Sequence, residues 1–314
     1  MNPLILKKGM KLPESIEDCP GGIIIPVDKP YRWTSADVIR KLKFAATRHF
    51  RKKNLKVGHA GTLDPLATGV LLVCIGNATK LAETLQSHDK EYIAGISFGA
   101  TTPSYDLEKD IDMRYPHGHI TEDGIREALK GFLGEQEQIA PLFSAKSVDG
   151  VRAYELARKL YKAHKKEAVY AAGAEARETV QGPEGRDSYS GNTGSGKIFD
   201  STADAVIRAA IIRISDISLL DFYPEGREQE ADTREDTARN LRINVVDTSS
   251  LHLPTAMVRI ECSKGTYIRA FARDLGEALG SGAHLSSLVR SRSGDFRVED
   301  CLSVNDALSS LQQA

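Results

Sequence analysis

The sequence is poor in residues that bind metals or build a disulfide framework. Its four cysteines form no C-x-x-C pair, and none lies at zinc-finger spacing to a histidine. They are Cys19, Cys74, Cys262 and Cys301, and we expect free, mostly buried thiols. His117 and His119 lie in a stretch with proline and glycine and have no third ligand nearby, so we interpret it as a solvated loop. We expect no metal site.

Long apolar segments are lacking as well. No run approaches the roughly 20 residues that span a bilayer, and the N-terminal stretch MNPLILKKGMKLPESIEDCPGG has no apolar signal-peptide core. We therefore expect a cytoplasmic protein without a membrane partner. The 314 residues, 41% of them hydrophobic and 27% charged, are enough for one large domain or two average ones.

The net charge is only −1, whereas nucleic-acid-binding proteins usually carry a basic excess. The distribution of charge is uneven, however. No acidic residue lies between Arg40 and Lys56, while residues 225–239 are mostly acidic. The basic residues of this run are Arg40, Lys41, Lys43, Arg48, Arg51, Lys52, Lys53 and Lys56. The run is typical either of a solvated helix face or of a surface that holds phosphate groups.

Residue periodicity predicts strands and helices without a regular βαβ rhythm. We expect strands at 23–27, 70–75, 92–98, 207–222 and 256–260. We expect helices after the caps Thr34, Asn77, Thr121 and Ser303, and at 151–166 and 265–279. The first begins with a capping-box-like Thr34 to Asp37, and Val38, Leu42 and His49 follow at helical spacing. This order favours an α+β fold with a largely antiparallel sheet. Residues of about 171–204 are rich in glycine and serine, which predicts a flexible surface insertion.

The segment Gly58 to Gly69, GHAGTLDPLATG, combines three glycines, a proline and one acidic residue. Glycine and proline prescribe a tight backbone path, so the loop can hold Asp64 rigidly beside the end of a strand. The same pattern is typical of a structural turn in which Asp64 forms an Asx turn. It is not a phosphate loop, because no G-K-[ST] follows the glycines.

A second segment, SKGTYIRAFARDLG at 263–276, lies at an expected junction of strand and helix. Arg269 and Arg273 are four residues apart and therefore share a helix face. One interpretation is that both are ordinary surface charges of a helix. In a functional interpretation, an arginine lies beside a buried carboxylate and keeps that carboxylate ionised.

Taken in order, these segments resemble the TruB-type tRNA pseudouridine-55 synthases. GHAGTLDPLATGVL is similar to the catalytic motif of that family. The resemblance extends from Gly22 to Val304 through GGIIIPVDKP, NATKL, DKEYIAGISFGATTPSYD, APLFSAKSVDGVRAYELAR and CSKGTYIRAFARDLGEALGSGAHLSSLVRSRSGDF. It implies a catalytic domain over residues 22–305, with the family's mixed, largely antiparallel sheet and flanking helices, after an N-terminal extension of residues 1–21.

The resemblance also implies how the domain is organised. Residues 139–166 correspond to the family's mobile thumb, which would close over the RNA. The insertion at 171–204 is longer than the family usually has. Because the chain stops soon after the last motif, we expect a bacterial short form without the C-terminal RNA-binding PUA domain.

The activity implied is conversion of the uridine at position 55, in the T loop of tRNA, to pseudouridine. The reaction breaks the N1–C1′ bond, turns the uracil and rejoins it through C5, so it requires no cofactor and no metal. The target base must first leave its stack. By resemblance, Asp64 is the catalytic carboxylate, acting as a nucleophile or at the sugar carbon. Arg269 keeps it charged, and Tyr92 stacks on the uracil and helps to remove the C5 proton.

Other residues are assigned to substrate binding by the same resemblance. His59 contacts RNA beside the extruded base, Tyr267 and Leu288 line the pocket, and Lys146 lies on the thumb. Lys29, in the Asp28-Lys29-Pro30 turn, borders the site and buttresses it. Because RNA is also held by its phosphates, the basic run is a candidate for backbone contacts through Arg48, Arg51, Lys52, Lys53 and Lys56. The expected partner is the T arm of tRNA, with no protein partner required.

Two other functions remain open. One is a non-catalytic RNA-binding or RNA-folding protein on the same scaffold, which loss of Asp64 or Arg269 would have favoured; both residues are present. The other is a pseudouridine synthase that acts on a different RNA.

Overall fold

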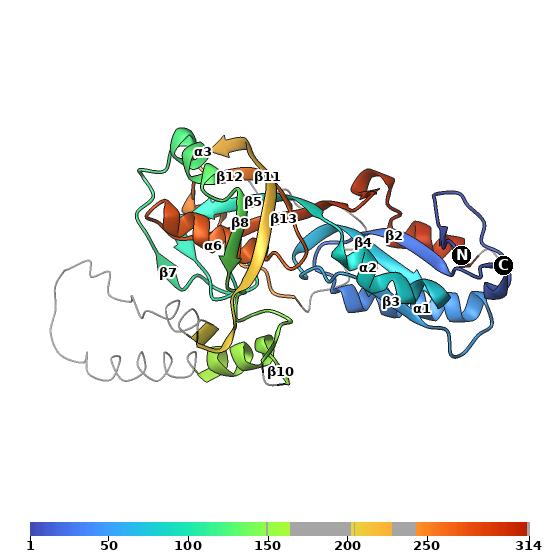
Figure 1. Ribbon diagram of the computed structural model, residues 1–314. Helices are drawn as coiled ribbons and strands as arrows, with labels where there is room; N and C mark the ends of the chain where they lie inside the picture. Colours follow the sequence, from blue (N-terminus) through green and yellow to red (C-terminus); the bar gives the residue numbers. More distant parts are fainter. Residues whose placement is uncertain (149, 164–201, 204, 228–242, 313–314) are drawn as a thin grey trace.

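The protein is built on one ten-stranded sheet (Figure 1). The structure is a computed structural model that describes residues 1–148, 150–163, 202–203, 205–227 and 243–312. The main path of the sheet is β1-β2-β4-β13-β5-β12-β11-β8, with β3 paired to β4 and β14 to β13. Among the described pairs in this sheet, only β1/β2 and β4/β13 are parallel. The predicted α+β fold with a largely antiparallel sheet is therefore confirmed.

The strands of this sheet differ widely in length. In the order of the path they are β1 (Leu4–Ile5), β2 (Ile23–Lys29), β4 (Ala67–Ile75), β13 (Ala283–Ser293), β5 (Lys90–Phe98), β12 (Thr255–Cys262), β11 (Ala210–Tyr223) and β8 (Gly134–Gln138), joined by β3 (Val57–Ala60) and β14 (Phe296–Arg297). Two small antiparallel pairs lie outside it: β6 (Ala100–Thr101) with β7 (Met113–Arg114), and β9 (Ser147–Val148) with β10 (Val151–Arg152).

The helices divide the molecule into two halves (Figure 1). The half with β2, β3 and β4 carries α1 (Ser35–His49), α2 (Ala82–Ser87) and α7 (Val304–Ser310). The half with β5, β8, β11 and β12 carries α3 (Glu122–Lys130) and α6 (Ile268–Ala278). The described chain also contains short 3-10 helices at Ile16–Asp18, Gly76–Leu81, Ser249–Leu251 and Val298–Asp300.

Strand β13 joins the two halves. Its residues Leu288 to Arg290 pair in parallel with Ala67 to Gly69 of β4, while its other edge pairs with β5 along most of its length. A Cβ atom on Gly69 would lie 2.2 Å from the carbonyl oxygen of Arg290, so only glycine allows this close approach. The start of β4, and the loop before it, is therefore held at the middle of the molecule.

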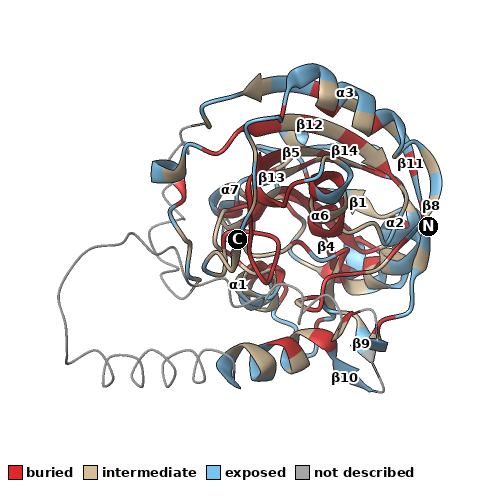
Figure 2. Cartoon of the chain, turned by 90° about the vertical axis from the view of Figure 1, so that its left-hand side faces the viewer, coloured by how far each residue is buried: buried red, intermediate tan, exposed pale blue. Residues whose placement is uncertain are grey.

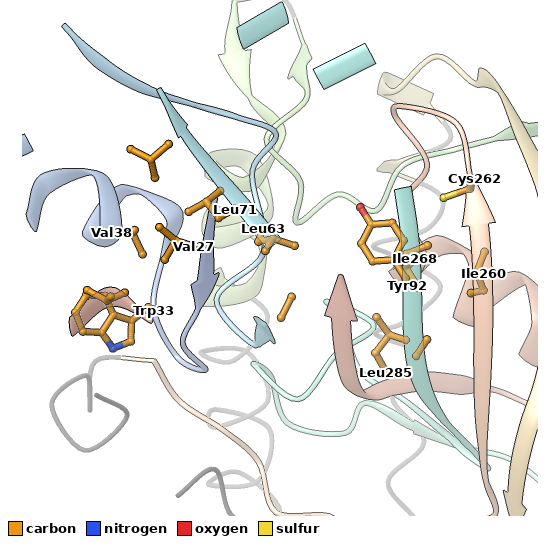
Figure 3. Packing of buried hydrophobic residues seen from close by; sticks show 14 of the residues in the cluster. Val27, Trp33, Val38, Leu63, Leu71, Tyr92, Ile260, Cys262, Ile268 and Leu285 are labelled. Atoms are coloured by element: carbon orange, nitrogen blue, oxygen red, sulfur yellow. The ribbon is translucent and has the colours of Figure 1, made fainter. Parts of the chain in front are cut away.

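The hydrophobic core extends through both halves. Buried residues are frequent on β5, β12, β13 and α6 (Figure 2). Val27 and Val38 from one half, and Ile260 and Cys262 from the other, belong to one cluster, with Leu63 between them (Figure 3). Valine and isoleucine suit these strands because β-branched side chains pack well on a pleated surface.

Local sequence signals located several elements correctly. Thr34 caps α1 in a reciprocal capping box with Asp37, and Thr121 and Ser303 cap α3 and α7. The expected cap at Asn77 was wrong: this residue lies inside the 3-10 helix, and its side-chain amide donates to the Pro20 carbonyl.

Other predicted elements need correction. The helix expected at 151–166 begins only at residue 153, because 151–152 form β10. The helix expected from Gly265 begins at Ile268, since Gly265 has a φ of +85° that a helix cannot accommodate. Strand β13 was not predicted at all.

The expected N-terminal extension packs against the sheet. Leu4 and Ile5 pair with Ile23 and Ile24, and Leu6 is buried. The insertion expected at 171–204 lies outside the described residues except for 202–203, and most of the acidic stretch 225–239 does so too. The four cysteines are free thiols, as expected. In the described part of the chain, no helix is long and apolar enough to cross a membrane.

Candidate active site

The loop Gly61 to Leu66, here called the Asp64 loop, joins β3 to β4, which pair in a hairpin. Gly61 has a φ of +86°, a conformation that few other residues adopt. The Ser35 hydroxyl accepts from the Leu63 amide at 2.9 Å and donates to the Leu63 carbonyl at 3.1 Å, so the first turn of α1 anchors the loop.

Lys29 anchors the same loop from β2. Its ammonium group donates to the carbonyls of Pro30, Trp33 and Pro65 at 2.9, 2.6 and 3.2 Å. The side chain is completely buried, and the contact to Pro65 fixes the backbone directly after Asp64. This geometry fits a buttress.

Asp64 pairs with Arg269, which lies 205 residues later in the sequence, in the first turn of α6. The guanidinium Nε donates to Oδ2 at 2.9 Å and Nη2 to Oδ1 at 3.2 Å, a bidentate arrangement. The Arg269 side chain is 5% exposed, whereas that of Asp64 is 39% exposed. The carboxylate is therefore fixed by a buried cation and is still accessible from outside.

A second carboxylate, Asp106, completes this arrangement. Its Oδ2 lies 3.8 Å from Arg269 Nε, and its side chain is 8% exposed. Oδ1 accepts from the Ser104 hydroxyl at 2.6 Å and the Glu108 amide at 2.9 Å. Burial raises the pKa of Asp106, and the nearby Arg269 charge opposes this. The pKa of Arg269 is raised, because the two carboxylates outweigh the effect of burial.

Sequence reasoning did not single out Asp106. It belongs to the segment DKEYIAGISFGATTPSYD, but a serine and an aspartate two residues apart are ordinary features of a turn. The distinctive signal is conformational: Tyr105, between them, has a φ of +56°. Such backbone strain in a residue other than glycine is concentrated at functional sites.

Two further hydrogen bonds of Arg269 reach neighbouring loops. Nη1 donates to the Ser104 carbonyl at 3.0 Å, and Nη2 donates to the Phe143 carbonyl at 2.9 Å. Phe143 belongs to the segment expected to form a thumb. Arg269 thus connects the Asp64 loop, the Asp106 turn and the beginning of that segment.

Beside this cluster lies a small recess. Asp64, Asp106 and Arg269 line it together with Leu107, Ser287 and Leu288. Its volume is about 20 Å³, which is room for about one water molecule. The recess is therefore nearly closed, and a larger group enters only if the side chains that line it move.

The three other predicted pocket residues occupy different surroundings. Tyr92, on β5, is 9% exposed, and burial raises its pKa. Tyr267 directly precedes α6, and its backbone is bonded to the side chain of Gln138. The charges of Arg269 and Asp64 both act on the Tyr267 hydroxyl. His59, on β3, has a lowered pKa because it is partly buried and lies near Arg290.

The basic run is divided between two surface hollows. The α1–α7 groove, of about 750 Å³, is lined by Arg40, Lys41, Phe44, Arg48, Arg51, Leu308 of α7 and the residues that directly follow α7. The β3 recess, of about 490 Å³, is lined by Lys43, Lys53 and Lys56. Lys52 instead forms an ion pair with Glu17 at 2.7 Å. Lys146, next to β9, donates to the Arg208 carbonyl at 2.8 Å.

No group of three or more histidine, cysteine, aspartate or glutamate residues in the described chain is arranged to hold a metal ion. In the Asp64 cluster, the two carboxylates lie 2.9 and 3.8 Å from the Arg269 guanidinium.

Comparisons with known proteins show which family this chain resembles. The family model described as "TruB family pseudouridylate synthase (N terminal domain)" matches residues 48–172. The chain is 42% identical over 283 residues to the "tRNA pseudouridine synthase B" of Phocaeicola vulgatus, covering 90% of each chain. It is 42% identical over 281 residues to the protein of the same name from Bacteroides thetaiotaomicron, covering 90% of this chain and 89% of that one.

A solved structure, "Crystal Structure of a Cbf5-Nop10-Gar1 Complex", is similar with a TM-score of 0.53 and 22% identity. The match covers 98% of this chain and 63% of that one, and it concerns the fold alone. The identity to the bacterial proteins extends over nine tenths of the sequence. This chain therefore belongs to the TruB family of pseudouridylate synthases.

Proposed function

We propose that this protein isomerises the uridine at position 55, in the T loop of tRNA, to pseudouridine. The proposal rests on the geometry of Asp64, an accessible carboxylate on a rigid loop. The buried Arg269 donates a hydrogen bond to each of its two oxygens. The similarity to proteins named tRNA pseudouridine synthase B supports tRNA as the substrate.

The chemistry requires one carboxylate beside the sugar and the base. The N1–C1′ bond breaks, the uracil turns, C5 bonds to C1′, and the C5 proton leaves. In the proposed mechanism Asp64 acts on the sugar, either by attack on C1′ or by removing a proton from the adjacent carbon, and both routes need it ionised. The bidentate pairing with Arg269 favours the ionised form and fixes its orientation.

The proposal includes an opening of the site. A uracil ring is larger than a recess of about 20 Å³, so the extruded base has to displace side chains that line it. The Phe143 carbonyl accepts a hydrogen bond from Arg269, so the thumb segment is connected directly to the residue that holds Asp64. We infer that the described part of this segment, residues 139–148 and 150–163, shifts as RNA enters, with Lys146 on the moving part.

The proposal also assigns roles to the remaining pocket residues. Leu288 supplies an apolar wall, and Tyr267 lies where the charges of Asp64 and Arg269 act on its hydroxyl. Tyr92 stacks on the base and accepts the C5 proton. His59 contacts the RNA at the edge of the site.

RNA backbone contacts are assigned to the two basic hollows. The α1–α7 groove offers Arg48 and Arg51, and the β3 recess offers Lys53 and Lys56. Lys52 takes part only by exchanging its exposed ion pair with Glu17 for a phosphate, which costs little because such pairs are weak.

The function is tested by single-turnover tritium release from tRNA that carries tritium at C5 of uridine. We expect the wild type to release tritium and Asp64→Asn to release none, with the fold and the RNA affinity largely intact. Asp123→Asn, an exposed position in the first turn of α3, is the matched control and should resemble the wild type. Binding without any conversion by the wild type would favour the non-catalytic alternative. Release from ribosomal RNA but not from tRNA would identify another substrate.

The backbone contacts are tested by the salt dependence of tRNA binding. Removing two phosphate contacts should flatten the slope of log K against log salt by about 1.4 to 1.8. We expect this for Arg48→Ala with Arg51→Ala, and for Lys53→Ala with Lys56→Ala. Arg126→Ala with Lys130→Ala, on α3, is the control, because both residues pair with glutamates of their own helix. An unchanged slope in either test pair would remove that hollow from the RNA interface.

A further inference from the structure

Arg290, on β13, is a buried cation that the proposed mechanism leaves without a role. Its side chain is among the largest that are fully buried, at 2% exposure. Within the described residues it forms no ion pair with a carboxylate. A buried charge is costly unless its donors are satisfied, so the contacts of this guanidinium explain why it is tolerated.

Its hydrogen bonds go to the backbone on both sides of Asp64. Nη2 donates to the Gly61 carbonyl at 3.2 Å and Nη1 to the Thr62 carbonyl at 3.4 Å. Nε donates to the Val70 carbonyl on β4 at 2.7 Å. One rigid group therefore clamps the entrance of the Asp64 loop to the strand that leaves it.

The same guanidinium faces Tyr92. Arg290 and Tyr92 are direct partners in the register of β13 and β5. The charge of Arg290 acts on the phenol oxygen, which points from β5 toward the side where Leu63 of the Asp64 loop lies (Figure 3). The other ionisable groups that act on this hydroxyl are Cys262, from β12, and Asp64 itself.

We propose that Arg290 is a positioning residue that holds the Asp64 loop and the Tyr92 hydroxyl in one fixed geometry. The inference rests on the proposed roles of Asp64 and Tyr92. Asp64 acts on the sugar and Tyr92 on C5 of the base, so the two groups must keep a constant separation while the uracil turns between them. A planar group with donors on several edges can span both, whereas a lysine ammonium concentrates its charge at one point.

The electrostatics support this geometry. Burial raises the pKa of the Tyr92 hydroxyl, which disfavours the phenolate that would accept the C5 proton. The charge of Arg290 opposes that increase. Removing the guanidinium should therefore slow proton removal specifically and move it to higher pH.

The test uses Arg290→Met, which keeps most of the volume, and Arg290→Lys, which keeps the charge. Single-turnover rates are measured on tRNA with protium or deuterium at C5, from about pH 6 to about pH 9. For Arg290→Met we expect the single-turnover rate to fall by more than about a hundredfold. The C5 isotope effect should be larger, and the rate should rise at a higher pH than in the wild type. Arg290→Lys should recover part of each change.

A matched control lies two residues further along the strand. Arg292 pairs with Glu261 at 2.7 Å, and in the described part of the chain it forms no hydrogen bond or ion pair with the Asp64 loop. Arg292→Met should keep its rate within about tenfold and leave both the isotope effect and the pH profile unchanged. If the role of Arg290 is purely structural, Arg290→Met should lower the rate but leave the isotope effect and the pH profile unchanged.

Tyr92→Phe separates this inference from the proposed function. If Tyr92→Phe releases the C5 proton at nearly the wild-type rate, the role of Tyr92 is wrong, whatever Arg290 does. If Tyr92→Phe is inactive while the Arg290 variants keep the wild-type isotope effect and pH profile, the positioning role alone is overturned. Failure of both Arg290 variants to fold would also overturn it in favour of a structural role. When Tyr92→Phe and Arg290→Met are combined, we expect a fold-loss of rate smaller than the product of the two single losses.

Discussion

Replacing Arg269 by alanine should lower both the stability of the protein and the rate of the reaction, for different reasons. The guanidinium is 5% exposed and contacts two carboxylates and two backbone carbonyls. Its removal leaves Asp106 buried without its cation, and breaking a buried ion pair in this way typically costs about 3–5 kcal/mol. Asp64 keeps water on its exposed side, so its share of that loss is smaller.

The rate should fall for a different reason. Without Arg269, nothing in the described structure fixes both oxygens of Asp64, so the carboxylate loses its orientation toward the sugar. We expect a loss of more than about a hundredfold, or about 2.7 kcal/mol at 1.36 kcal/mol for each factor of ten. Arg269→Lys should rescue only part of it, because an ammonium cannot donate in a bidentate fork.

A second substitution distinguishes the two effects. Adding Asp106→Asn to Arg269→Ala removes the unpaired buried charge and should recover at least about 1 kcal/mol of stability, with no recovery of rate. The measurements are denaturant unfolding and single-turnover tritium release. Turnover of Arg269→Ala within about tenfold of the wild type, at unchanged stability, would refute the reasoning for both carboxylates.

Three further predictions concern other parts of the molecule. Activity should be unchanged in excess EDTA without added nucleotide; loss on chelation that a metal ion restores would contradict the metal-free mechanism. Lys29→Met should lower the free energy of unfolding by about 3 kcal/mol, because three carbonyls lose a charged donor, and denaturant titration measures this. His284 is completely buried, and burial lowers its pKa, so the folded state resists its protonation. The stability that the neutral, buried His284 contributes is fully present above about pH 6.5. It is lost as the pH falls further, because the unfolded chain then binds a proton that the folded chain does not. His284→Asn, which can still bond to the Ala100 carbonyl, should flatten that decline in unfolding experiments across this range.

Features that depend on neighbouring residues could be predicted from the sequence. The capping box at Thr34 and Asp37 starts α1 where the pattern indicated, and Val38, Leu42 and His49 are buried on the face that their spacing predicted. The glycines and proline around Asp64 indicated a fixed loop, and Gly61 adopts the positive φ that such a loop requires. Local geometry alone decides these features, so one segment is sufficient to predict them.

Strand β13 could not be predicted because its partners are distant in sequence. AHLSSLVRSRS lacks a clean alternation of apolar and polar residues, since Ser286 and Ser287 border the recess and Arg290 is buried. An arginine in a sequence indicates the surface, because burying its charge is favourable only when donors find acceptors. Those acceptors are carbonyls of Gly61, Thr62 and Val70, more than 200 residues earlier.

Composition and motif order alone determined the family resemblance, the α+β class and the loop that carries Asp64. Tertiary structure decided which charges meet there. Spacing placed Arg269 on a helix, but only the packing of α6 against the sheet brings it to Asp64 and adds Asp106. The physical reason is that ion pairing acts through space and falls with distance, whereas sequence patterns report only the few residues that share a turn or a strand.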